Sequence, residues 1–185
     1  MSPALRPAVF LDRDGTLIEE RGYPSRSEDI VVLPGVGRAL ARLGEAGFLR
    51  IVLTNQSGVA RGLFTEEELG RLHDELFRKL AEQGGNVDVL YYCPHHPEGK
   101  ARAYAHACAC RKPGRGLLDV ALAEHAVDLS RSAFIGDSPR DLFQDVAGAG
   151  ARILVRSGHA LQEGAKADFV AMDLGEAVEW LLARR

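Results

Sequence analysis

Two aspartates, Asp12 and Asp14, lie two residues apart directly after the apolar run Ala8–Leu11, and Gly15 follows them. Mg²⁺ prefers oxygen ligands and commonly binds through one or two carboxylates together with phosphate oxygens of a substrate. A carboxylate can also attack phosphorus and form an acyl-phosphate. Because the same residues also suit an ordinary turn after a strand, this motif indicates phosphoryl chemistry only in combination with others.

Two further motifs offer groups that bind phosphate. Thr54-Asn55-Gln56-Ser57 follows the apolar run 50–53 and carries hydroxyl and amide donors. Arg111 and Lys112 could neutralise phosphate charge, arginine as a two-pronged donor and lysine as a point charge. Each motif alone also fits a turn or a solvated loop, so neither is specific.

A late pair of carboxylates follows the apolar run 133–135. Asp137 could complete a metal site with Asp12. For Asp141, in the first turn of a helix opened by Ser138 and Pro139, we expect a contact with that helix start rather than direct metal ligation.

All three cysteines of the chain lie in one segment, in the pattern Cys-x-His, twelve residues, Cys-x-Cys. An odd number of cysteines argues against a disulfide framework. Three thiolates and one imidazole match a closed, tetrahedral structural zinc site. The pattern offers Cys93, Cys108 and Cys110 with one of three histidines, His95, His96 or His106; free thiols in a loop are the alternative.

Short apolar runs alternate with amphipathic stretches along most of the chain. Near-continuous Val, Ile and Leu without polar alternation predicts buried parallel strands. The stretches between them have the spacing of helices that pack one face on a core. The pattern predicts a doubly wound α/β fold of one domain over 1–185, with a metal-binding loop at about 93–110 and no large cap domain. The expected strands are Ala8–Leu11, Arg50–Leu53, Val87–Tyr92, Ala133–Ile135, Ile153–Val155 and, more weakly, Asp168–Val170.

The charge and the apolar content of the chain limit the classes of partner that we expect. The 185 residues carry 23 Lys and Arg against 26 Asp and Glu, a net charge of -3. A nucleic-acid-binding domain usually carries a basic excess, so we expect no nucleic-acid partner. No apolar run approaches the roughly 18 residues that span a bilayer, and we see no signal peptide. We therefore expect a cytoplasmic protein without a membrane partner.

The order acid pair, hydroxyl, lysine, acid resembles the haloacid dehalogenase (HAD) superfamily of phosphotransferases over residues 10–149. The resemblance implies a magnesium-dependent phosphatase on a HAD-like sheet. Asp12 would be the nucleophile and Asp14 the proton donor to the leaving oxygen. Thr54 and Lys112 would hold the phosphoryl group, and Asp12, Asp137 and the main-chain carbonyl of Asp14 would bind Mg²⁺.

Within that superfamily, a zinc loop directly before the lysine motif resembles the heptose bisphosphate phosphatases, with histidinol-phosphate phosphatases as relatives and as the alternative reading. The resemblance implies a phosphorylated sugar as substrate, in the supply of heptose for lipopolysaccharide or other surface glycans, a monomeric protein, and His95 as the zinc-binding histidine. Ser138 is a departure, because many members have lysine there. The implied substrate contacts are Glu20, Arg21, Gly22, Tyr23, Thr54, Asn55, Gln56, Ser57, Arg111 and Lys112.

Two other classes of protein share parts of this pattern. A receiver domain is also doubly wound and binds Mg²⁺, but it needs an acceptor aspartate after its third strand, where this chain has Tyr91-Tyr92-Cys93. A zinc-bearing nucleic-acid module would need a basic surface stripe. We expect neither.

Overall fold

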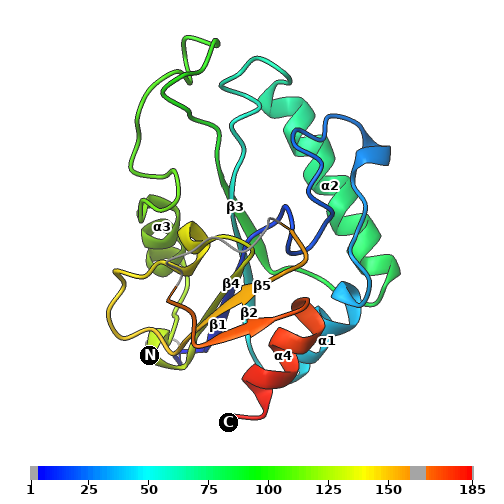
Figure 1. The fold of residues 1–185 in the computed structure, drawn as a ribbon, viewed down its shortest axis with the longest axis vertical. Helices are drawn as coiled ribbons and strands as arrows, with labels where there is room; N and C mark the ends of the chain where they lie inside the picture. The colour runs from blue at the N-terminus through cyan, green and yellow to red at the C-terminus, as the bar shows by residue number, and fades with distance from the viewer. Residues whose placement is uncertain (1–3, 159–165, 185) are drawn as a thin grey trace.

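The structure is a computed structural model, and it describes residues 4–158 and 166–184. Six parallel strands form one sheet in the order β3-β2-β1-β4-β5-β6 (Figure 1). All six predicted strands are confirmed, with ends that differ by up to two residues. Their bounds are β1 Ala8–Leu11, β2 Leu49–Asn55, β3 Val89–Cys93, β4 Ala133–Gly136, β5 Ala151–Val155 and β6 Phe169–Ala171.

The strand order reverses direction at β1. The chain moves outward from β1 through β2 to β3, then returns to place β4 on the other side of β1. In doubly wound sheets, ligands bind beyond the carboxyl ends of the strands at such a reversal. The topology therefore places the crevice over the ends of β1, β2 and β4.

The four α-helices of the described residues cover the two faces of the sheet (Figure 1). Apolar residues of α1, α2 and α4 form one core with the sheet, and α3 packs on the opposite face, where the rings of Phe10 and Phe134 stack. The helices are α1 Val36–Glu45, α2 Glu66–Glu82, α3 Gly116–Glu124 and α4 Leu174–Leu182, and short 3-10 turns are η1 Ser27–Asp29, η2 Leu129–Arg131 and η3 Pro139–Leu142.

Thr65 and Glu68 form a reciprocal cap at the start of α2. Thr65 Oγ1 accepts the backbone N–H of Glu68 at 3.1 Å, and the Glu68 carboxylate accepts the backbone N–H of Thr65 at 2.7 Å. These bonds satisfy two of the free N–H groups at a helix start. The cap fixes where α2 begins.

The predicted helix after Ser138 is wrong. The chain forms only the 3-10 turn η3, and Phe143 directly after it adopts a left-handed conformation with φ 43°. A non-glycine residue in that region ends a helix. The sequence signal at Ser138 and Pro139 marks a helical start but carries no information about length.

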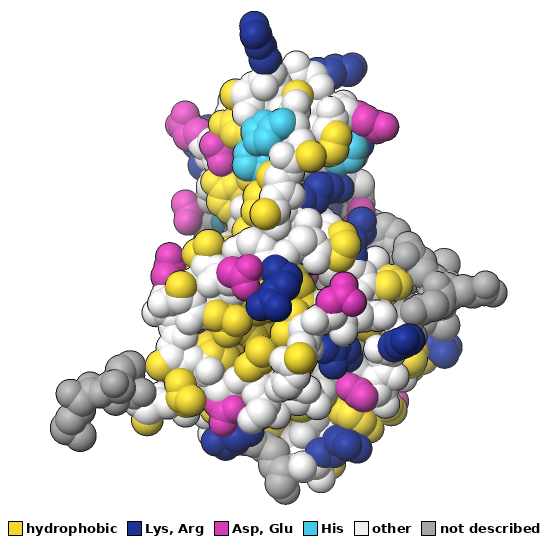
Figure 2. All heavy atoms as spheres, turned by 90° about the vertical axis from the view of Figure 1, so that its left-hand side faces the viewer, with side chains coloured by type: hydrophobic (Ala, Val, Ile, Leu, Met, Phe, Trp, Pro, Cys, Tyr) yellow, Lys and Arg dark blue, Asp and Glu magenta, His cyan; other side chains and the backbone are white. Residues whose placement is uncertain are grey.

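A long loop, residues 94–115, connects β3 to α3 and rises above the carboxyl ends of the strands (Figure 1). Its histidines gather in the upper part of the molecule in Figure 2. Glu66 at the start of α2 accepts hydrogen bonds from Tyr92 Oη at 2.9 Å and Tyr104 Oη at 2.7 Å. The loop is therefore tied to α2 as well as to the sheet.

Among the helices in the described residues, none combines the length and apolar character needed to cross a bilayer.

Candidate active site

A cavity of about 240 Å³ opens at the carboxyl ends of β1 and β2. It brings together residues from the predicted motifs that are far apart in the sequence. The residues that line it are Asp12, Asp14, Glu20, Gly22, Tyr23, Thr54, Asn55, Gln56, Ser57, Arg61, Arg111, Lys112, Arg140 and Asp141.

Lys112 reaches the centre of this cavity from the end of loop 94–115. Its Nζ lies 2.6 Å from Asp12 Oδ1, 2.7 Å from Asp141 Oδ1 and 2.5 Å from the carbonyl oxygen of Leu53. The ammonium group donates hydrogen bonds to Asp12 and to the Leu53 carbonyl and forms an ion pair with Asp141. Burial alone would lower the pKa of Lys112, but attraction to Asp12 and Asp141 outweighs burial and raises it. The lysine is held as a cation beside Asp12.

Asn55 holds the backbone of Lys112 in place. Its Oδ1 accepts the Lys112 N–H at 3.0 Å, and its Nδ2 donates to the Lys112 carbonyl at 3.1 Å. The sequence predicts Asn55 as a substrate contact, but both ends of its amide are used by the protein. Asn55 connects the end of β2 to the loop and positions the ammonium group.

Asp12, Asp137 and Asp141 each offer a carboxylate oxygen within 4.8 Å of the others. Burial, opposed by Lys112 and reinforced by the neighbouring aspartates, raises the pKa of Asp12 to about 7. Three carboxylates beside one ammonium leave an excess of two negative charges. Hard oxygen ligands with that excess fit a divalent cation such as Mg²⁺.

The structure changes the expectation for Asp141, a member of this acid group. Asp141 accepts the backbone N–H of Ser138 at 3.0 Å, as predicted, but it also contacts Lys112 and belongs to the carboxylate cluster. The carboxylate of Asp14 is not in the cluster, so the proposed contribution of Asp14 to a metal site is through its main-chain carbonyl.

Gly15 gives the Asp137 carboxylate its space. Its φ of +79° lies in the left-handed region, and a Cβ there would lie 2.3 Å from Asp137 Oδ2. Any other residue would be strained in conformation and would also displace that oxygen. The position of the Asp137 carboxylate therefore requires a glycine at position 15.

Thr54 and Gln56 form a donor pair on the wall of the cavity. Gln56 Nε2 lies 2.9 Å from Thr54 Oγ1 and can only donate to it. The threonine hydroxyl therefore keeps its own hydrogen for another acceptor. This arrangement can donate to a phosphoryl oxygen, as the sequence predicts.

Asp14 lies in the cavity wall with donors on both oxygens. Arg13 donates to Oδ2 from Nε at 3.0 Å and to Oδ1 from Nη2 at 2.9 Å, and Gln56 Nε2 donates to Oδ2 at 2.9 Å. The proton-donor role that the resemblance implies for Asp14 calls for surroundings that favour a neutral carboxyl group. The structure instead surrounds Asp14 with donors that suit the carboxylate.

Three arginines line the outer part of the cavity, and sequence reasoning identified only Arg111. Burial lowers the pKa of Arg111, and the positive charges of Arg140 and Arg61 lower it further. The ion pairs among the described residues include none of the three. Such a group of cations attracts an anion. Arg61 and Arg140 could have been found from their places just after the 54–57 and 137–138 motifs.

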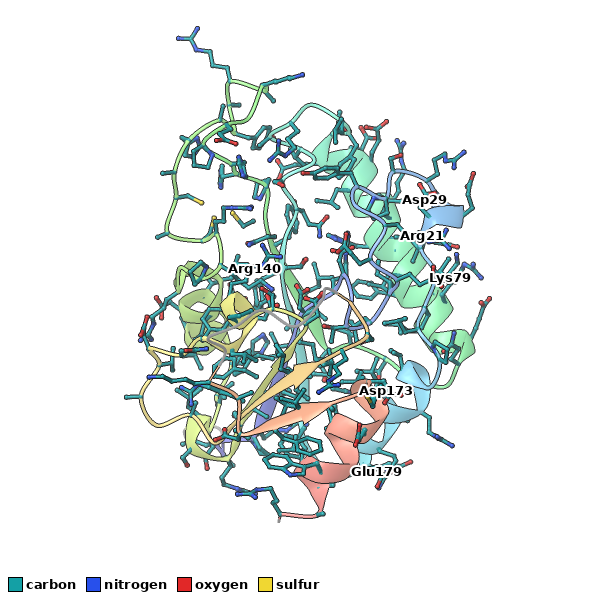
Figure 3. The ribbon with its side chains drawn as sticks, in the orientation of Figure 1. Arg21, Asp29, Lys79, Arg140, Asp173 and Glu179 are labelled. Carbon is teal, nitrogen blue, oxygen red and sulfur yellow. The ribbon has the colours of Figure 1, made fainter. Side chains whose placement is uncertain are left out.

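Two predicted site residues lie outside the lining. Asp137 is almost wholly buried and does not line the cavity, although its carboxylate belongs to the acid group. Arg21 is half-exposed and pairs with Glu19 at 2.6 Å. In Figure 3 Arg140 lies in the middle of the molecule, whereas Arg21 lies on the side of α2.

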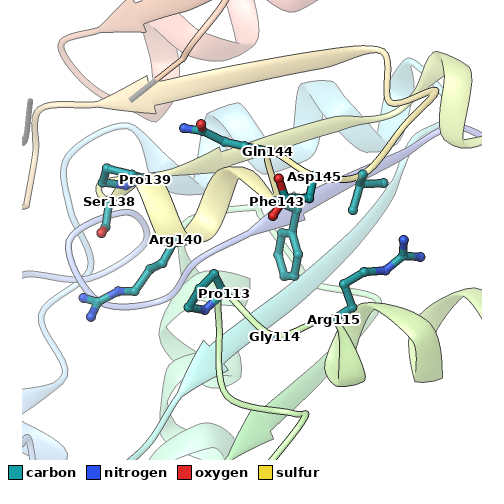
Figure 4. A pocket seen from close by; sticks show the side chains of 10 residues that line it. Pro113, Gly114, Arg115, Ser138, Pro139, Arg140, Phe143, Gln144 and Asp145 are labelled. Carbon is teal, nitrogen blue, oxygen red and sulfur yellow. The ribbon is translucent and has the colours of Figure 1, made fainter. Parts of the chain in front are cut away.

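A second hollow of about 560 Å³ lies beside the cavity and shares only Arg140 with it (Figure 4). This hollow is lined by neither the carboxylate group nor Lys112, so its larger volume does not indicate an active site. The Arg140 side chain in Figure 4 points away from Phe143 and Arg115, which line that hollow.

The second metal-ligand group is made of Cys93, His95, Cys108 and Cys110. The sulfur atoms lie 3.0 to 3.4 Å apart, and His95 Nδ1 lies 3.3 Å from Cys110 Sγ and 3.8 Å from Cys93 Sγ. Burial raises the pKa of the Cys93 thiol, so its thiolate form needs a cation. Four converging S and N ligands fit Zn²⁺ with no open position. Of the three candidate histidines, the structure selects His95.

Comparisons with known proteins place the chain among HAD phosphatases. A HAD-hydrolase-like family model matches residues 109–177. A D-glycero-beta-D-manno-heptose-1,7-bisphosphate 7-phosphatase from Haemophilus ducreyi is 41% identical over 95% of this chain and 98% of its own. A D-glycero-D-manno-heptose-1,7-bisphosphate 7-phosphatase from Thermosynechococcus vestitus is 42% identical over 95% of both chains. The chain belongs to the heptose-1,7-bisphosphate 7-phosphatase family of HAD-like hydrolases.

A solved structure extends this similarity to three dimensions. The D,D-heptose 1,7-bisphosphate phosphatase from B. bronchiseptica, complexed with magnesium and phosphate, is 35% identical and aligns with a TM-score of 0.80. The alignment covers 97% of this chain and 99% of the other. The similarity therefore extends over nearly the whole chain, well beyond residues 109–177 that the family model matches.

Proposed function

We propose that this protein is a Mg²⁺-dependent phosphatase that removes the 7-phosphate of D-glycero-D-manno-heptose 1,7-bisphosphate. The observation that carries the proposal is the Asp12 carboxylate, held 2.6 Å from the Lys112 ammonium inside a group of carboxylates at the base of the cavity. The names of the 38–42% identical relatives support the choice of substrate.

In the first half of the reaction, an Asp12 oxygen attacks phosphorus and forms an aspartyl-phosphate. The bond between phosphorus and the ester oxygen breaks, and that oxygen takes a proton from Asp14. Lys112 and the Thr54 hydroxyl stabilise the charge on the phosphoryl oxygens, which is where catalysis of this step mainly acts. Bound Mg²⁺, held by Asp12, Asp137 and the Asp14 carbonyl with Asp141 close by, would reduce the repulsion between the carboxylate and the phosphate.

In the second half, water attacks the phosphorus of the aspartyl-phosphate. Asp14, now a carboxylate, takes a proton from that water, and the bond between phosphorus and Asp12 breaks. Inorganic phosphate leaves, and both aspartates return to their starting forms. The same carboxyl group thus serves as acid and then as base.

The three arginines at the outer end would bind the 1-phosphate. The fork of a guanidinium suits a phosphate that does not react, because it fixes orientation as well as charge. Arg140 gives this end a cation close to Ser138, where many family members carry lysine. Glu20, Gly22 and Tyr23 would contact the sugar between the two phosphates; the Glu20 carboxylate accepts the Gly22 N–H at 2.7 Å and shapes that segment.

A panel of phosphate esters tests the proposed substrate. With Mg²⁺ present, kcat/KM should be highest for heptose 1,7-bisphosphate and lower for fructose 1,6-bisphosphate and histidinol phosphate. Histidinol phosphate as the best substrate by orders of magnitude would replace this proposal with the alternative activity.

We also propose a metabolic context, a cellular compartment and an oligomeric state for the enzyme. Its product, a heptose 1-phosphate, suits nucleotide activation on the way to lipopolysaccharide or other surface glycans. Three free cysteines placed as zinc ligands fit a reducing compartment such as the cytoplasm. The catalytic set is complete within one chain, which supports a monomer.

A further inference from the structure

Arg13, between the two catalytic aspartates, is among the largest fully buried side chains and is 1% exposed. It does not line the cavity. Its guanidinium holds Asp14 on one side through Nε and Nη2, and on the other side Nη1 lies 3.2 Å from Nε2 of His73 on α2. No step of the proposed mechanism uses His73, although it is 6% exposed and connected to the proton donor through one residue.

The direction of the contact between Arg13 and His73 follows from chemistry. A guanidinium has five donors and no acceptor, so His73 Nε2 must accept and its proton must lie on Nδ1. Burial and, to a smaller extent, the charge of Arg13 lower the pKa of His73 to about 3, against the opposing effect of Asp14. The imidazole is therefore a neutral acceptor across the working pH range. Its ring packs against Tyr92, with centroids 5.5 Å apart, which limits its movement.

The donors on Asp14 distinguish its two oxygens. Oδ2 accepts two hydrogen bonds, from Arg13 Nε and Gln56 Nε2, whereas Oδ1 accepts one, from Arg13 Nη2. A carboxylate oxygen has two lone pairs, so Oδ1 keeps one for a further proton. The planar fork of Arg13 sets the plane of the carboxyl group and hence the direction of that lone pair.

We propose that His73, acting through Arg13, is a positioning residue that aims Oδ1 of Asp14 at the leaving oxygen. This inference rests on the proposed function, in which Asp14 is the proton donor. The proton on Oδ1 passes to the ester oxygen as the bond to phosphorus breaks, and water later returns a proton to the same atom. The Arg13 fork also stabilises the negative charge that Asp14 acquires on donation.

The test compares leaving groups. A sugar alkoxide needs a proton as it leaves, whereas p-nitrophenolate does not. General acid catalysis is worth roughly 10²–10⁴-fold, and a misplaced group can lose about 10²-fold. His73→Leu should therefore lower the pre-steady-state rate of leaving-group release, which reports the first half of the reaction alone, by about 10- to 100-fold for the heptose bisphosphate, with that rate for p-nitrophenyl phosphate within about threefold. His73→Gln, which keeps an acceptor, should recover most of the loss.

Further variants distinguish misfolding of His73→Leu from failure of the proposed positioning role. Arg13→Lys keeps the charge but loses the two-pronged geometry of the guanidinium, so it should show the same selective loss. This variant provides the test if His73→Leu does not fold. His125→Leu, at a histidine that contacts Tyr91 rather than the site, should leave the ratio of the two activities unchanged. Equal losses on both esters, or no loss, for folded His73→Leu and Arg13→Lys would overturn the inference.

Asp14→Asn tells a failure of this inference from a failure of the proposed function. It should show the same dependence on leaving group, in stronger form. If Asp14→Asn lacks that dependence, Asp14 is not the proton donor and the proposed mechanism fails. If Asp14→Asn shows the dependence and the His73 and Arg13 variants do not, only the positioning role fails.

Discussion

Asp12 and Lys112 lie 100 positions apart in the sequence, yet they form a buried ion pair. The contact is favourable only because other acceptors and charges complete it, since an isolated buried charge is costly. Lys112 donates hydrogen bonds to Asp12 and the Leu53 carbonyl and pairs with Asp141, and the excess negative charge around it suits a metal ion. At the scale of single residues, the carboxylates of the site outnumber its one ammonium group, and a divalent cation would neutralise the remaining negative charge.

Residue types identified the groups that can react, but not the groups that hold them. Asp12, Thr54, Lys112 and Asp137 carry distinctive chemistry at predicted strand ends, and the structure gathers them. The role of Asn55 depends on a contact with a residue 57 positions away. No local pattern encodes that contact, and the same is true of Arg13 and His73.

The buried His73 makes stability depend on pH. Its pKa is lowered from 6.5 to about 3, so between these values the unfolded chain binds a proton that the folded chain does not. The free energy of unfolding therefore falls as pH drops through this window, by about 1.4 kcal/mol per pH unit from this group. Urea unfolding of the wild type and His73→Leu at several pH values should show a shallower slope for the variant. Equal slopes would show that His73 is not buried as a neutral side chain.

Loop 94–115 is the element whose shape depends most on a ligand. It has little apolar core of its own, and its first and last parts meet at the Cys93, His95, Cys108 and Cys110 group. Arg111 and Lys112 directly follow the last ligand. Zinc binding would therefore set the position of Lys112, for which we propose a catalytic role.

Removal of zinc should lower both stability and turnover. We expect one zinc per chain by metal analysis, and a chelator strong enough to remove it should lower the melting temperature. Turnover should stay low when Mg²⁺ alone is restored and return when Zn²⁺ is added. Cys108→Ser should behave as the stripped protein does. A zinc-free sample with full turnover would contradict a structural role for the loop.

Local elements were largely predictable, and their order in space was not. Apolar runs and the Thr65 cap define strands and the start of α2 because each rests on neighbouring residues. The length of η3 was not predictable, because Phe143 ends it through a backbone conformation with no sequence signature. The return of β4 to the side of β1 depends on long-range packing, and it is this return that brings Asp137 beside Asp12.

On the scale of the whole molecule, the cavity has two chemically different ends. The acid group and Lys112 lie at its base, and Arg61, Arg111 and Arg140 line its outer part. A substrate with one reacting phosphate and one distant phosphate matches this division. The net charge of -3 does not reveal this division, because binding depends on the few cations inside the cavity rather than on the total charge.

Selectivity for a bisphosphate should depend on the outer arginines. Arg140→Gln should raise KM for heptose 1,7-bisphosphate by about tenfold, the equivalent of about 1.4 kcal/mol, and leave kcat/KM for a monophosphate ester little changed. Arg115→Gln is the matched control, because Arg115 lies outside the cavity and pairs with Asp119 at 3.0 Å. Equal losses on bisphosphate and monophosphate would place Arg140 outside the binding of the second phosphate.

The most direct test of the account is chemical trapping of the covalent intermediate. Rapid quenching during turnover, followed by borohydride reduction and peptide mass spectrometry, should find homoserine in place of Asp12 and aspartate at position 14. Asp12→Asn, which is nearly isosteric, should keep the fold and give neither turnover nor a trapped product. Full turnover by Asp12→Asn, or a trapped phosphate on a different residue, would contradict the central claim.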